Sequence, residues 1–585
     1  MKKLALVFDF WKQHKGWVVA LVLATVVATA LSLAFPYILR FIIDGIKQQI
    51  PVSRLLHYVL LLVGFGLLRA VAEVVLPYNR AKVNMRYQWD VRSRVFRRTL
   101  DLGHSFTNKF PTGDVMERLD HDMEELSWFA GSGIFRGMAA VFTVILGLGI
   151  MVSMNPLLTL VTVLPMGLGV FVWMKLGPLV YSRYMKWRKK ISEINSRIES
   201  SFTGIMLVKG YNMEKRLAHG FRKILDERVE AAVDTIKVQS KIYTFYMGIA
   251  ELGILLVLWV GGFLVMGSQL TLGEFVAFNA YVLMLVQPLF DIGNLFVSGR
   301  RAQGCAERIA ALKQHPTEVE PPEKPGPVEP GSASMLPSDG TTLKLEKVDF
   351  SYDSEPVLKN ASMSFPTGAR IGIAGTVGSG KSTIFRLLFR LADPQKGRVV
   401  LGNRNVRLLD LDHYRKLFGY APQEATLFSD TLKNNIVFGR DENDKELKWV
   451  ISLAQLSSDL ADFPKGFDEV LGERGTRLSG GQKERVAIAR ALVGRPRVLV
   501  FDDATSSLDA ETEKGLIDRM TRELGKTTLI IVSHRLSILS ACDRIYVLDQ
   551  GEVKEEGTHQ ELLSRKGLYW DLYERQLIKK ELEQL

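Results

Sequence analysis

Six apolar stretches of about twenty residues or more fill much of the first half of the chain. Each is long enough to cross a bilayer as a helix. They lie at residues 17–39, 55–77, 134–154, 157–180, 243–266 and 275–297. Short connections join them into three pairs, and long connections separate the pairs. This pattern predicts an all-α, six-helix transmembrane domain.

The connections differ in charge as well as in length. The short ones, at residues 44–54, 155–156 and 267–274, hold only Lys47 and Arg54 as basic residues. The long ones are strongly basic, with Arg80, Lys82, Arg86, Arg92, Arg94, Arg97, Arg98, Arg183, Lys186, Arg188, Lys189 and Lys190. Since basic loops stay on the cytoplasmic side, we expect a multi-pass protein of the cytoplasmic membrane with both termini in the cytosol. Apolar residues at helical spacing continue into the long connections, so the spans should extend as helices beyond the bilayer.

The pattern changes after residue 313. Residues 314–340 are rich in proline, glycine, serine and glutamate and read as a linker, because such a segment buries no core. From 341 to 585, short β-branched runs alternate with helical patterns, as in an α/β domain. The expected organisation is therefore a transmembrane domain over residues 1–313, a linker, and an α/β domain over 341–585.

Composition agrees with this division. Hydrophobic residues make up 47% of the 585 residues, yet charged residues still make up 24%, which fits an apolar part joined to a polar one. The net charge of +12 gathers beside the apolar runs, which favours anionic lipid over nucleic acid as its partner. Cys305 and Cys542 are the two cysteines, and they indicate neither a disulfide framework nor a metal site.

A phosphate-binding loop stands near the start of the α/β domain. Gly375-Thr-Val-Gly-Ser-Gly-Lys381-Ser382 follows a strand-like run and opens a helical one, which is the context that this motif requires. Its glycines allow backbone N–H groups to turn toward phosphate oxygens. Lys381 is expected to neutralise the outer phosphates and Ser382 to hold Mg²⁺.

Two further elements point to nucleotide chemistry. Asp502 and Asp503 end a buried-strand pattern, where a carboxylate of a parallel sheet is placed to hold Mg²⁺. Leu478-Ser-Gly-Gly-Gln482 precedes a helix expected to begin near Lys483 and forms another candidate anion site. One chain needs only one such site for its own ATP, so the second is expected to serve a nucleotide held elsewhere.

These residues resemble the ATP-binding cassette (ABC) transporters, and Leu478 to Gln482 is similar to the signature of that family. Other motifs follow in the family's order: Tyr352 resembles the adenine-stacking aromatic, Gln423 the γ-phosphate-sensing glutamine and His534 the switch histidine. Gly472-Glu-Arg-Gly475 resembles the exporter-specific loop, and Ser507-Leu-Asp509 the D-loop. Six spans before one cassette resemble an exporter half-transporter of the multidrug or lipid type.

The resemblance implies ATP and Mg²⁺ as cofactors and a set of roles. ATP would contact Tyr352, Gly375, Thr376, Val377, Gly378, Ser379, Gly380, Lys381, Ser382 and Thr383 of one cassette and Ser479, Gly480, Gly481 and Gln482 of the other. Mg²⁺ would be held by Ser382, Gln423 and Asp502, while Asp503, His534 and Gln423 would support hydrolysis. The partner would be a second half-transporter, because cassettes of this family dimerise head to tail.

One residue departs from the family pattern. Exporters of this type usually place glutamate after the magnesium-binding aspartate, and here that position is Asp503. Aspartate is one methylene shorter, and in-line attack tolerates little misplacement. The chain therefore resembles the degenerate-site subunit of a heterodimeric exporter. The alternatives are a conservative swap in a homodimeric lipid flippase or exporter with active ATP sites, and an ATP-gated channel or regulatory cassette protein.

Polar residues inside the predicted spans are candidates for a transport pathway, because ionisable groups in a bilayer usually face water or the bundle interior. They are Arg69, Glu73, Arg136, Glu251, Asn279, Asp291 and Asn294. Glu251 and Asp291 favour cationic amphiphiles, whereas Arg69 favours an anionic lipid. Residues 110–114 and 202–206 break the long helical connections and are expected to couple to the cassette near Gln423.

Overall fold

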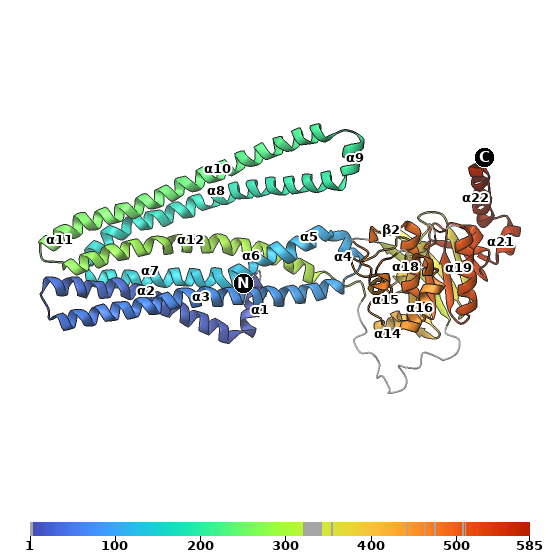
Figure 1. Cartoon of the computed structure of the whole chain (residues 1–585), viewed down its shortest axis with the longest axis horizontal. Coiled ribbons are helices and arrows are strands. Elements are labelled where there is room, and N and C mark those ends of the chain that lie inside the picture. The colour runs from blue at the N-terminus through green and yellow to red at the C-terminus, as the bar shows by residue number, and fades with distance from the viewer. Residues whose placement is uncertain are drawn as a thin grey trace, which may run out of the picture. The chain divides into compact units, whose positions relative to one another are not determined.

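The computed structural model describes residues 4–319, 342–352, 355–440, 443–460, 463–472, 475–505, 508 and 510–584. Most of the predicted linker therefore lies outside the described residues, as do Glu473, Arg474, Ser507 and Asp509. The chain forms two compact units (Figure 1). One comprises residues 1–102 and 106–315, and the other residues 103–105 and 316–585.

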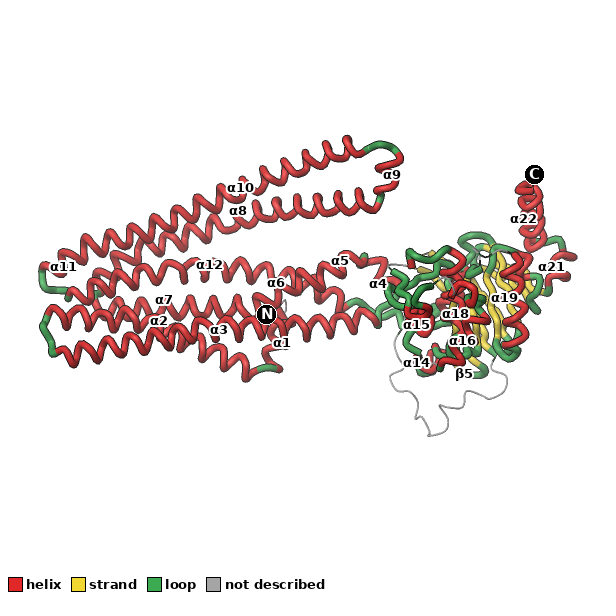
Figure 2. The backbone as a smooth tube through the Cα atoms, viewed as in Figure 1, coloured by secondary structure: helices red, strands yellow, loops and turns green. Residues whose placement is uncertain are grey.

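The first unit is helical throughout (Figure 2). Its elements are α1 (Ala5–Gln13), α2 (Lys15–Lys47), α3 (Val52–Leu100), α4 (His104–Lys109, whose first residues belong to the other unit), α5 (Thr112–Glu117), η2 (Arg118–Asp122), α6 (Met123–Trp128), η3 (Phe129–Gly133), α7 (Ile134–Met154), α8 (Pro156–Thr203), α9 (Ile205–Gly210), α10 (Glu214–Leu256), η4 (Val257–Gly261), α11 (Gly262–Met266) and α12 (Leu272–Gln314). The helices α2, α3, α7 and α12 pack together, and α8 lies along α10.

Within the described residues, five helical segments are long and apolar enough to cross a membrane. They are Lys15–Lys47, Val52–Leu100, Thr112–Met154, Glu214–Met266 and Leu272–Gln314. Helix α8 contains the predicted span 157–180, and its described apolar part is the shorter segment Pro156–Gly169. Most of these helices run well past the 20 residues that a bilayer requires, as the amphipathic continuation of the spans predicted.

The second unit is an α/β domain built on two sheets. Its strands are β1 (Leu343–Tyr352), β2 (Glu355–Phe365), β3 (Arg370–Gly375), β4 (Lys396–Leu401), β5 (Arg404–Asn405), β6 (Phe418–Ala421), β7 (Val498–Asp502), β8 (Thr528–Val532), β9 (Arg544–Asp549) and β10 (Glu552–Gly557). The smaller sheet has the order β2-β1-β4-β5, and the larger β10-β9-β3-β8-β7-β6. Strands β9, β3, β8, β7 and β6 are parallel, so their carboxyl ends share one edge.

Helices cover this domain. They are α13 (Lys381–Leu388), α14 (Leu411–Arg415), α15 (Leu432–Val437), α16 (Asp444–Leu453), α17 (Ser457–Leu460), α18 (Gly480–Leu492), α19 (Ala510–Glu523), α20 (Leu536–Leu539), α21 (His559–Arg565) and α22 (Leu568–Gln584). Successive residues of a strand point to opposite faces. Leu499 and Phe501 of β7 accordingly join one core cluster, while Val498 and Val500 join the other. A strand buried on both faces reads as a continuous apolar run, as β7 does.

Candidate nucleotide site

The candidate phosphate-binding loop joins β3 to α13, as the sequence predicted. All three of its glycines occupy the left-handed region, with φ of +151° at Gly375, +80° at Gly378 and +100° at Gly380. A Cβ atom at Gly375 would lie 2.3 Å from the carbonyl oxygen of Leu548, and one at Gly380 would lie 2.9 Å from Cδ2 of Leu358. Only glycine fits both positions, since a side chain would be strained and would collide with neighbours.

Lys381 lies under this loop and is only 8% exposed. Its Nζ donates hydrogen bonds to the carbonyl oxygens of Gly375 at 2.9 Å and Thr376 at 2.7 Å. Burial lowers the pKa of Lys381, and the nearby carboxylates of Asp502 and Asp503 oppose that shift. The loop therefore contains a desolvated cation, which is the group that an anionic phosphate would pair with most strongly.

The remaining loop residues differ in exposure. Val377 is 90% exposed, whereas the Ser379 hydroxyl is buried and has no hydrogen-bond partner among the described residues. Ser382 is exposed and Thr383 is buried. Thr376 donates from Oγ1 to the carboxylate of Asp549, 3.1 Å away. The Ser382 hydroxyl and the Asp502 carboxylate supply the oxygen donors that Mg²⁺ prefers.

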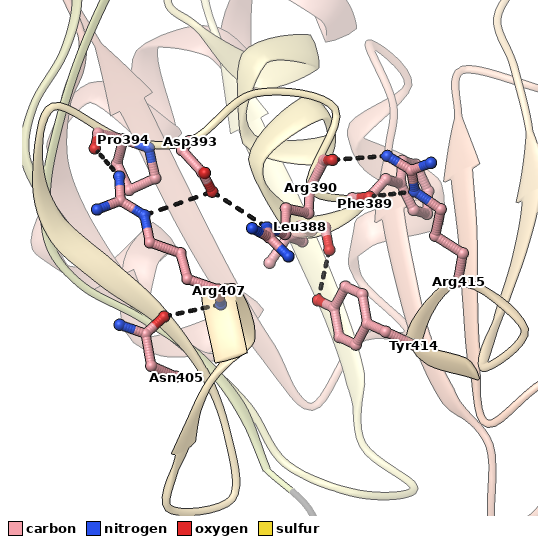
Figure 3. Close-up of polar contacts among 9 residues, drawn as sticks. All are labelled: Leu388, Phe389, Arg390, Asp393, Pro394, Asn405, Arg407, Tyr414 and Arg415. Carbon is pink, nitrogen blue, oxygen red and sulfur yellow. Dashed lines mark hydrogen bonds and ion pairs between the residues drawn. The ribbon is translucent and has the colours of Figure 1, made fainter. Parts of the chain in front are cut away.

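The far end of α13 is anchored by side chains from the α14 region (Figure 3). The Tyr414 hydroxyl donates to the carbonyl of Leu388 at 2.5 Å, and Arg415 donates to the carbonyls of Phe389 at 3.1 Å and Arg390 at 2.7 Å. These carbonyls lie at the helix end, where partners within the helix are missing. The anchoring therefore fixes the helix whose first turn carries Lys381.

Tyr352, the predicted adenine-stacking residue, lies at the end of β1. The guanidinium of Arg386 donates from Nη1 to its hydroxyl at 3.0 Å, and Arg386 Cζ lies 5.4 Å from the ring centroid. Arg386 comes from α13, the same helix as Lys381. This cation–π contact orients the ring. The sequence analysis missed Arg386, because its only signal was a basic residue on a helix five positions after the loop lysine.

The two acidic residues that end β7 have different surroundings. Asp502 is 7% exposed and accepts a hydrogen bond from the Tyr420 hydroxyl at 3.4 Å. Burial raises the pKa of Asp502, and the Tyr420 bond and Lys381 oppose that rise. Asp503 is half-buried and adopts a left-handed φ of +50°. Its Oδ1 accepts bonds from the Ser533 hydroxyl at 3.5 Å and from the backbone N–H of His534 at 3.3 Å.

His534 follows β8 and its side chain is exposed. Two side chains hold the loop around it. Gln576 of α22 donates from Nε2 to the carbonyl of His534, and its Oε1 accepts from the N–H of Leu536 at 3.0 Å. Arg535 donates to the carbonyl of Leu508 at 3.0 Å and pairs with Glu513 at 3.1 Å. Sequence reasoning did not find these supports, because they join segments that lie far apart along the chain.

Gln423 lies in the loop after β6 and is exposed. Strand β6 pairs with β7 in parallel, with Ala421 opposite Phe501. Gln423 therefore emerges at the same sheet edge as Asp502 and Asp503. Electrostatic and hydrogen-bond contacts bring Lys381, Asp502, Asp503 and the His534 loop together at that edge.

The signature segment stands at the start of α18, which begins at Gly480 rather than near Lys483. Ser479 caps the helix: its hydroxyl accepts from the N–H of Gln482 at 3.3 Å, and Gln482 Oε1 accepts from the N–H of Ser479 at 3.0 Å. Ser479 and Gly480 are exposed. Within the described residues, no hydrogen bond joins Ser479–Gln482 to the phosphate-binding loop of the same chain. The segment therefore presents its free surface to solvent.

A buried acidic residue supports the signature from behind. Asp459 of α17 is 9% exposed. It accepts hydrogen bonds from Gln482 Nε2 at 3.2 Å and from Arg485 Nη2 at 2.8 Å. The pair of contacts orients the first turn of α18, and sequence alone offered no signal that Asp459 would do so.

In the helical unit, the polar residues predicted to mark a pathway have varied surroundings. Arg69 and Glu73 form an ion pair of 2.8 Å along one face of α3. Asp291 accepts from Gln287 at 3.4 Å, and Glu251 is exposed. The Asn279 side-chain oxygen is buried without a hydrogen-bond partner among the described residues. The predicted coupling segments coincide with helix ends, since α5 begins at Thr112 and α8 ends at Thr203.

Comparison with known proteins defines the class. The pattern of the ABC transporter transmembrane region matches residues 18–289, and the ABC transporter pattern matches residues 358–506. A probable multidrug resistance ABC transporter ATP-binding/permease protein, YheI of Bacillus subtilis, is 32% identical over 83% of this chain and 82% of that protein. An ATP-dependent lipid A-core flippase of Syntrophus aciditrophicus is 27% identical over 84% of this chain and 81% of that protein.

A solved structure gives the same result. The structure of a bacterial Atm1-family ABC exporter with ATP bound has a TM-score of 0.81 and 28% identity, over 96% of this chain and 99% of that one. This chain belongs to the ABC exporter family. It is a multi-span membrane protein and an ATPase that couples ATP hydrolysis to transport, with Mg²⁺ as the partner of ATP, and exporters of this family work as dimers.

Proposed function

We propose that this chain is the degenerate-site subunit of a heterodimeric exporter that carries amphipathic molecules, such as drugs or lipids, across the cytoplasmic membrane. Its termini face the cytosol in this proposal, because the long basic connections lie on their side of the spans. Its own ATP site binds nucleotide and turns it over slowly, while its signature completes a competent site on the partner.

The conformation of Asp503 carries the proposal. A left-handed backbone is more accessible to aspartate than to most residues, because its short polar side chain bonds locally. The carboxylate accordingly bonds Ser533 and the N–H of His534, and so faces its own chain. A carboxylate used in this way is poorly placed to orient a water for in-line attack, which needs accurate positioning.

The other site residues either bind this chain's own nucleotide or complete the nucleotide site of the partner. ATP with Mg²⁺ supplies the phosphoryl group that is transferred to water. Lys381 neutralises the outer phosphates, the Ser382 hydroxyl and the Asp502 carboxylate hold the metal, and Gln423 lines the same edge. In trans, Ser479 and Gly481 contact the nucleotide of the partner, an arrangement supported by the capped start of α18, where Ser479 and Gly480 are exposed.

ATPase measurements on the purified chain test the proposal. The chain alone should bind ATP with little turnover, and Asp503→Ala should change that turnover little. Adding a partner that carries glutamate at the equivalent position should give hydrolysis, and removing that glutamate should cost about 10²–10⁴-fold. Asp503→Asn serves as a matched control that keeps the reach of the side chain and removes the charge.

The homodimer is the second candidate and makes the opposite prediction. In that case the wild-type chain alone hydrolyses ATP briskly, and Asp503→Ala abolishes the activity. Measurements of cargo flux distinguish an exporter from an ATP-gated channel, because only an exporter accumulates cargo against a gradient while it consumes ATP.

The polar residues of the predicted spans indicate which charge the transported molecule carries. Arg69 is already paired with Glu73, so it offers less to an anionic lipid than an unpaired cation would. Glu251 and Asp291 have no cationic partner within the described residues, which supports a preference for cationic amphiphiles. Transport of a cationic dye should fall in Glu251→Gln and Asp291→Asn while transport of a neutral analogue does not. Equal loss of both would contradict the preference.

A further inference from the structure

An apolar groove runs between α2 and α3 on the surface of the helical unit. It has a volume of about 560 Å³. Its wall includes Val27 of α2, which is 55% exposed, and Leu68 and Val71 of α3, which are 57% and 59% exposed. Apolar side chains this open to the surroundings are stable in a bilayer, where lipid tails cover them.

A second cavity of about 530 Å³ continues the groove at its polar end, because Trp17 and Lys82 line both. The second cavity is also lined by Arg86, Trp89 and His14. The guanidinium carbon of Arg86 lies 4.5 Å from the centre of the Trp89 ring. Tryptophan and basic side chains are the residues that gather at the boundary between hydrocarbon and headgroups.

The two cations at this end have no acidic partner within the described residues. Within the described residues, neither Lys82 nor Arg86 forms an ion pair, whereas the neighbouring Arg94 pairs with Asp90. Arg80, by contrast, turns inward and donates to Thr25 Oγ1 at 3.3 Å. The end of the groove therefore presents two exposed positive charges and two indole rings to the membrane surface.

The length of the groove matches one leaflet of a bilayer. Along α3 its apolar lining runs from Leu68 to Leu76, about 12 Å at 1.5 Å per residue, and the wall reaches the polar Asn79 after about 16 Å. Half of a hydrocarbon core of about 30 Å is about 15 Å. Lys82 and Arg86 follow one and two turns beyond that wall, at the depth where headgroup phosphates lie.

We propose that this groove binds one anionic glycerophospholipid, with an acyl chain along the wall and its phosphate beside Lys82 and Arg86. The charges favour an anionic headgroup over a zwitterionic one, and the indole rings favour the interfacial glycerol region. The site goes beyond the proposed export function, since it involves neither the nucleotide site nor the polar residues proposed for cargo.

Native mass spectrometry of the full-length protein, purified in detergent, tests the proposal with phosphatidylglycerol and phosphatidylcholine of the same acyl chains. Basic residues near an anionic membrane surface are each worth about fivefold in binding. The wild type should therefore retain phosphatidylglycerol about 30-fold more tightly than phosphatidylcholine. Lys82→Gln with Arg86→Gln should reduce that preference to about threefold or less. Excess inorganic phosphate should leave lipid binding unchanged.

A control pair lies at the other end of the same two helices. Lys47→Gln with Arg54→Gln removes two exposed cations and should preserve the preference for phosphatidylglycerol. Val71→Trp should fill the groove and weaken retention of both lipids about tenfold. Size-exclusion profiles and ATP binding show whether each variant is folded.

Three results would overturn the proposal. One is equal retention of the two lipids by the wild type, and another is an equal loss of preference in the two double variants. The third is efficient photocrosslinking to the partner subunit from a photoreactive amino acid placed at position 71 in membrane vesicles, because it would show that the partner subunit covers the groove. The ATPase measurements on Asp503 are independent of all three outcomes.

Discussion

The two units of this chain place apolar residues in opposite ways. In the helical unit, large apolar side chains face outward: Leu23, Val63 and Leu67 are 59%, 53% and 65% exposed. In the cassette, every residue of β7 is buried, including Leu499 at 0%. A hydrophobic run of similar strength therefore marks a lipid-facing surface in one unit and a core in the other.

The difference shows what holds each unit together. In α2, the buried positions include Thr25 and Thr29, whose hydroxyls donate to carbonyls one turn earlier at 2.6 and 2.8 Å. Lipid tails are as apolar as leucine, so helices in a membrane associate through close packing of small residues and polar contacts. The cassette is surrounded by water, so burying Leu and Phe side chains stabilises it directly.

Lys381 is an exception to the apolar interior of the cassette, because it is a buried cation. Lys381→Ala should weaken ATP binding at this chain's own site by about 30-fold or more, because a desolvated charge loses its phosphate partner. Equilibrium binding of a fluorescent ATP analogue measures the effect. Lys381→Met is the matched control, since it keeps the stem volume; it should lose binding equally while its thermal stability stays near that of the wild type.

Ser479→Arg should act on the partner's nucleotide instead. Binding of ATP to this chain's own site should change less than about twofold, whereas ATPase of the assembled dimer should fall about 100-fold, since closure over the partner's nucleotide is blocked. Equal loss of own-site binding in Ser479→Arg and Lys381→Ala would contradict the head-to-tail arrangement.

Truncating a leucine to alanine in each unit tests whether the two units differ in how tightly their apolar side chains are packed. Leu499→Ala in β7 should cost about 2–5 kcal/mol of unfolding free energy, because it leaves a cavity in the core. Leu67→Ala, at a position 65% exposed, should cost less than about 0.5 kcal/mol. Thermal unfolding in detergent, followed separately for each unit by limited proteolysis, compares them. Similar costs for the two variants would show that the lipid-facing surface is packed after all.

The close packing of α12 against α2 in the helical unit can be tested at Gly273. A Cβ atom at Gly273 would lie 2.2 Å from the carbonyl oxygen of Arg40 and 2.6 Å from Cγ of Asp44. Asp44 also accepts from the N–H of Gly273 and the hydroxyl of Thr271, both at 2.7 Å, which ties α2 to α12. Gly273→Ala should destabilise the unit by about 1–3 kcal/mol.

Gly64→Ala is the control for that substitution, because a Cβ there meets nothing within 4 Å. It should stay within about 0.5 kcal/mol of the wild type. Thermal unfolding in detergent measures both variants, and a Gly273→Ala protein as stable as Gly64→Ala would mean that the two helices are not in close contact.

The smallest effect is expected at Gln576. Gln576→Ala removes two hydrogen bonds to the loop around His534 and should cost about 1 kcal/mol. Hydrogen exchange of the residues that follow β8 should rise, while exchange in β7 stays unchanged. Glu574→Ala, at an exposed position of the same helix, is the control. Unchanged exchange around His534 in Gln576→Ala would indicate that α22 does not hold that loop.

Much of this protein was determined by its sequence alone. The apolar stretches predicted the helical unit, because a bilayer demands a run of about 20 apolar residues whatever the packing. The phosphate-binding loop was predicted between β3 and α13, because its glycines are required by the local backbone conformation. The order of the motifs predicted the ABC family, which the comparisons confirm. The roles of the individual site residues stay predictions.

Only the tertiary structure decided which distant residues support those motifs. Asp459 behind Gln482, Gln576 beside His534 and Arg386 over Tyr352 are contacts between separate elements, and a local pattern carries no record of them. The left-handed backbone of Asp503 and its bonds to the β8 loop likewise come from the pairing of β7 with β8. A phosphate-binding motif consists of consecutive residues and can be recognised in the sequence. The partners of a side chain, by contrast, depend on the packing of distant segments that come together only when the chain folds.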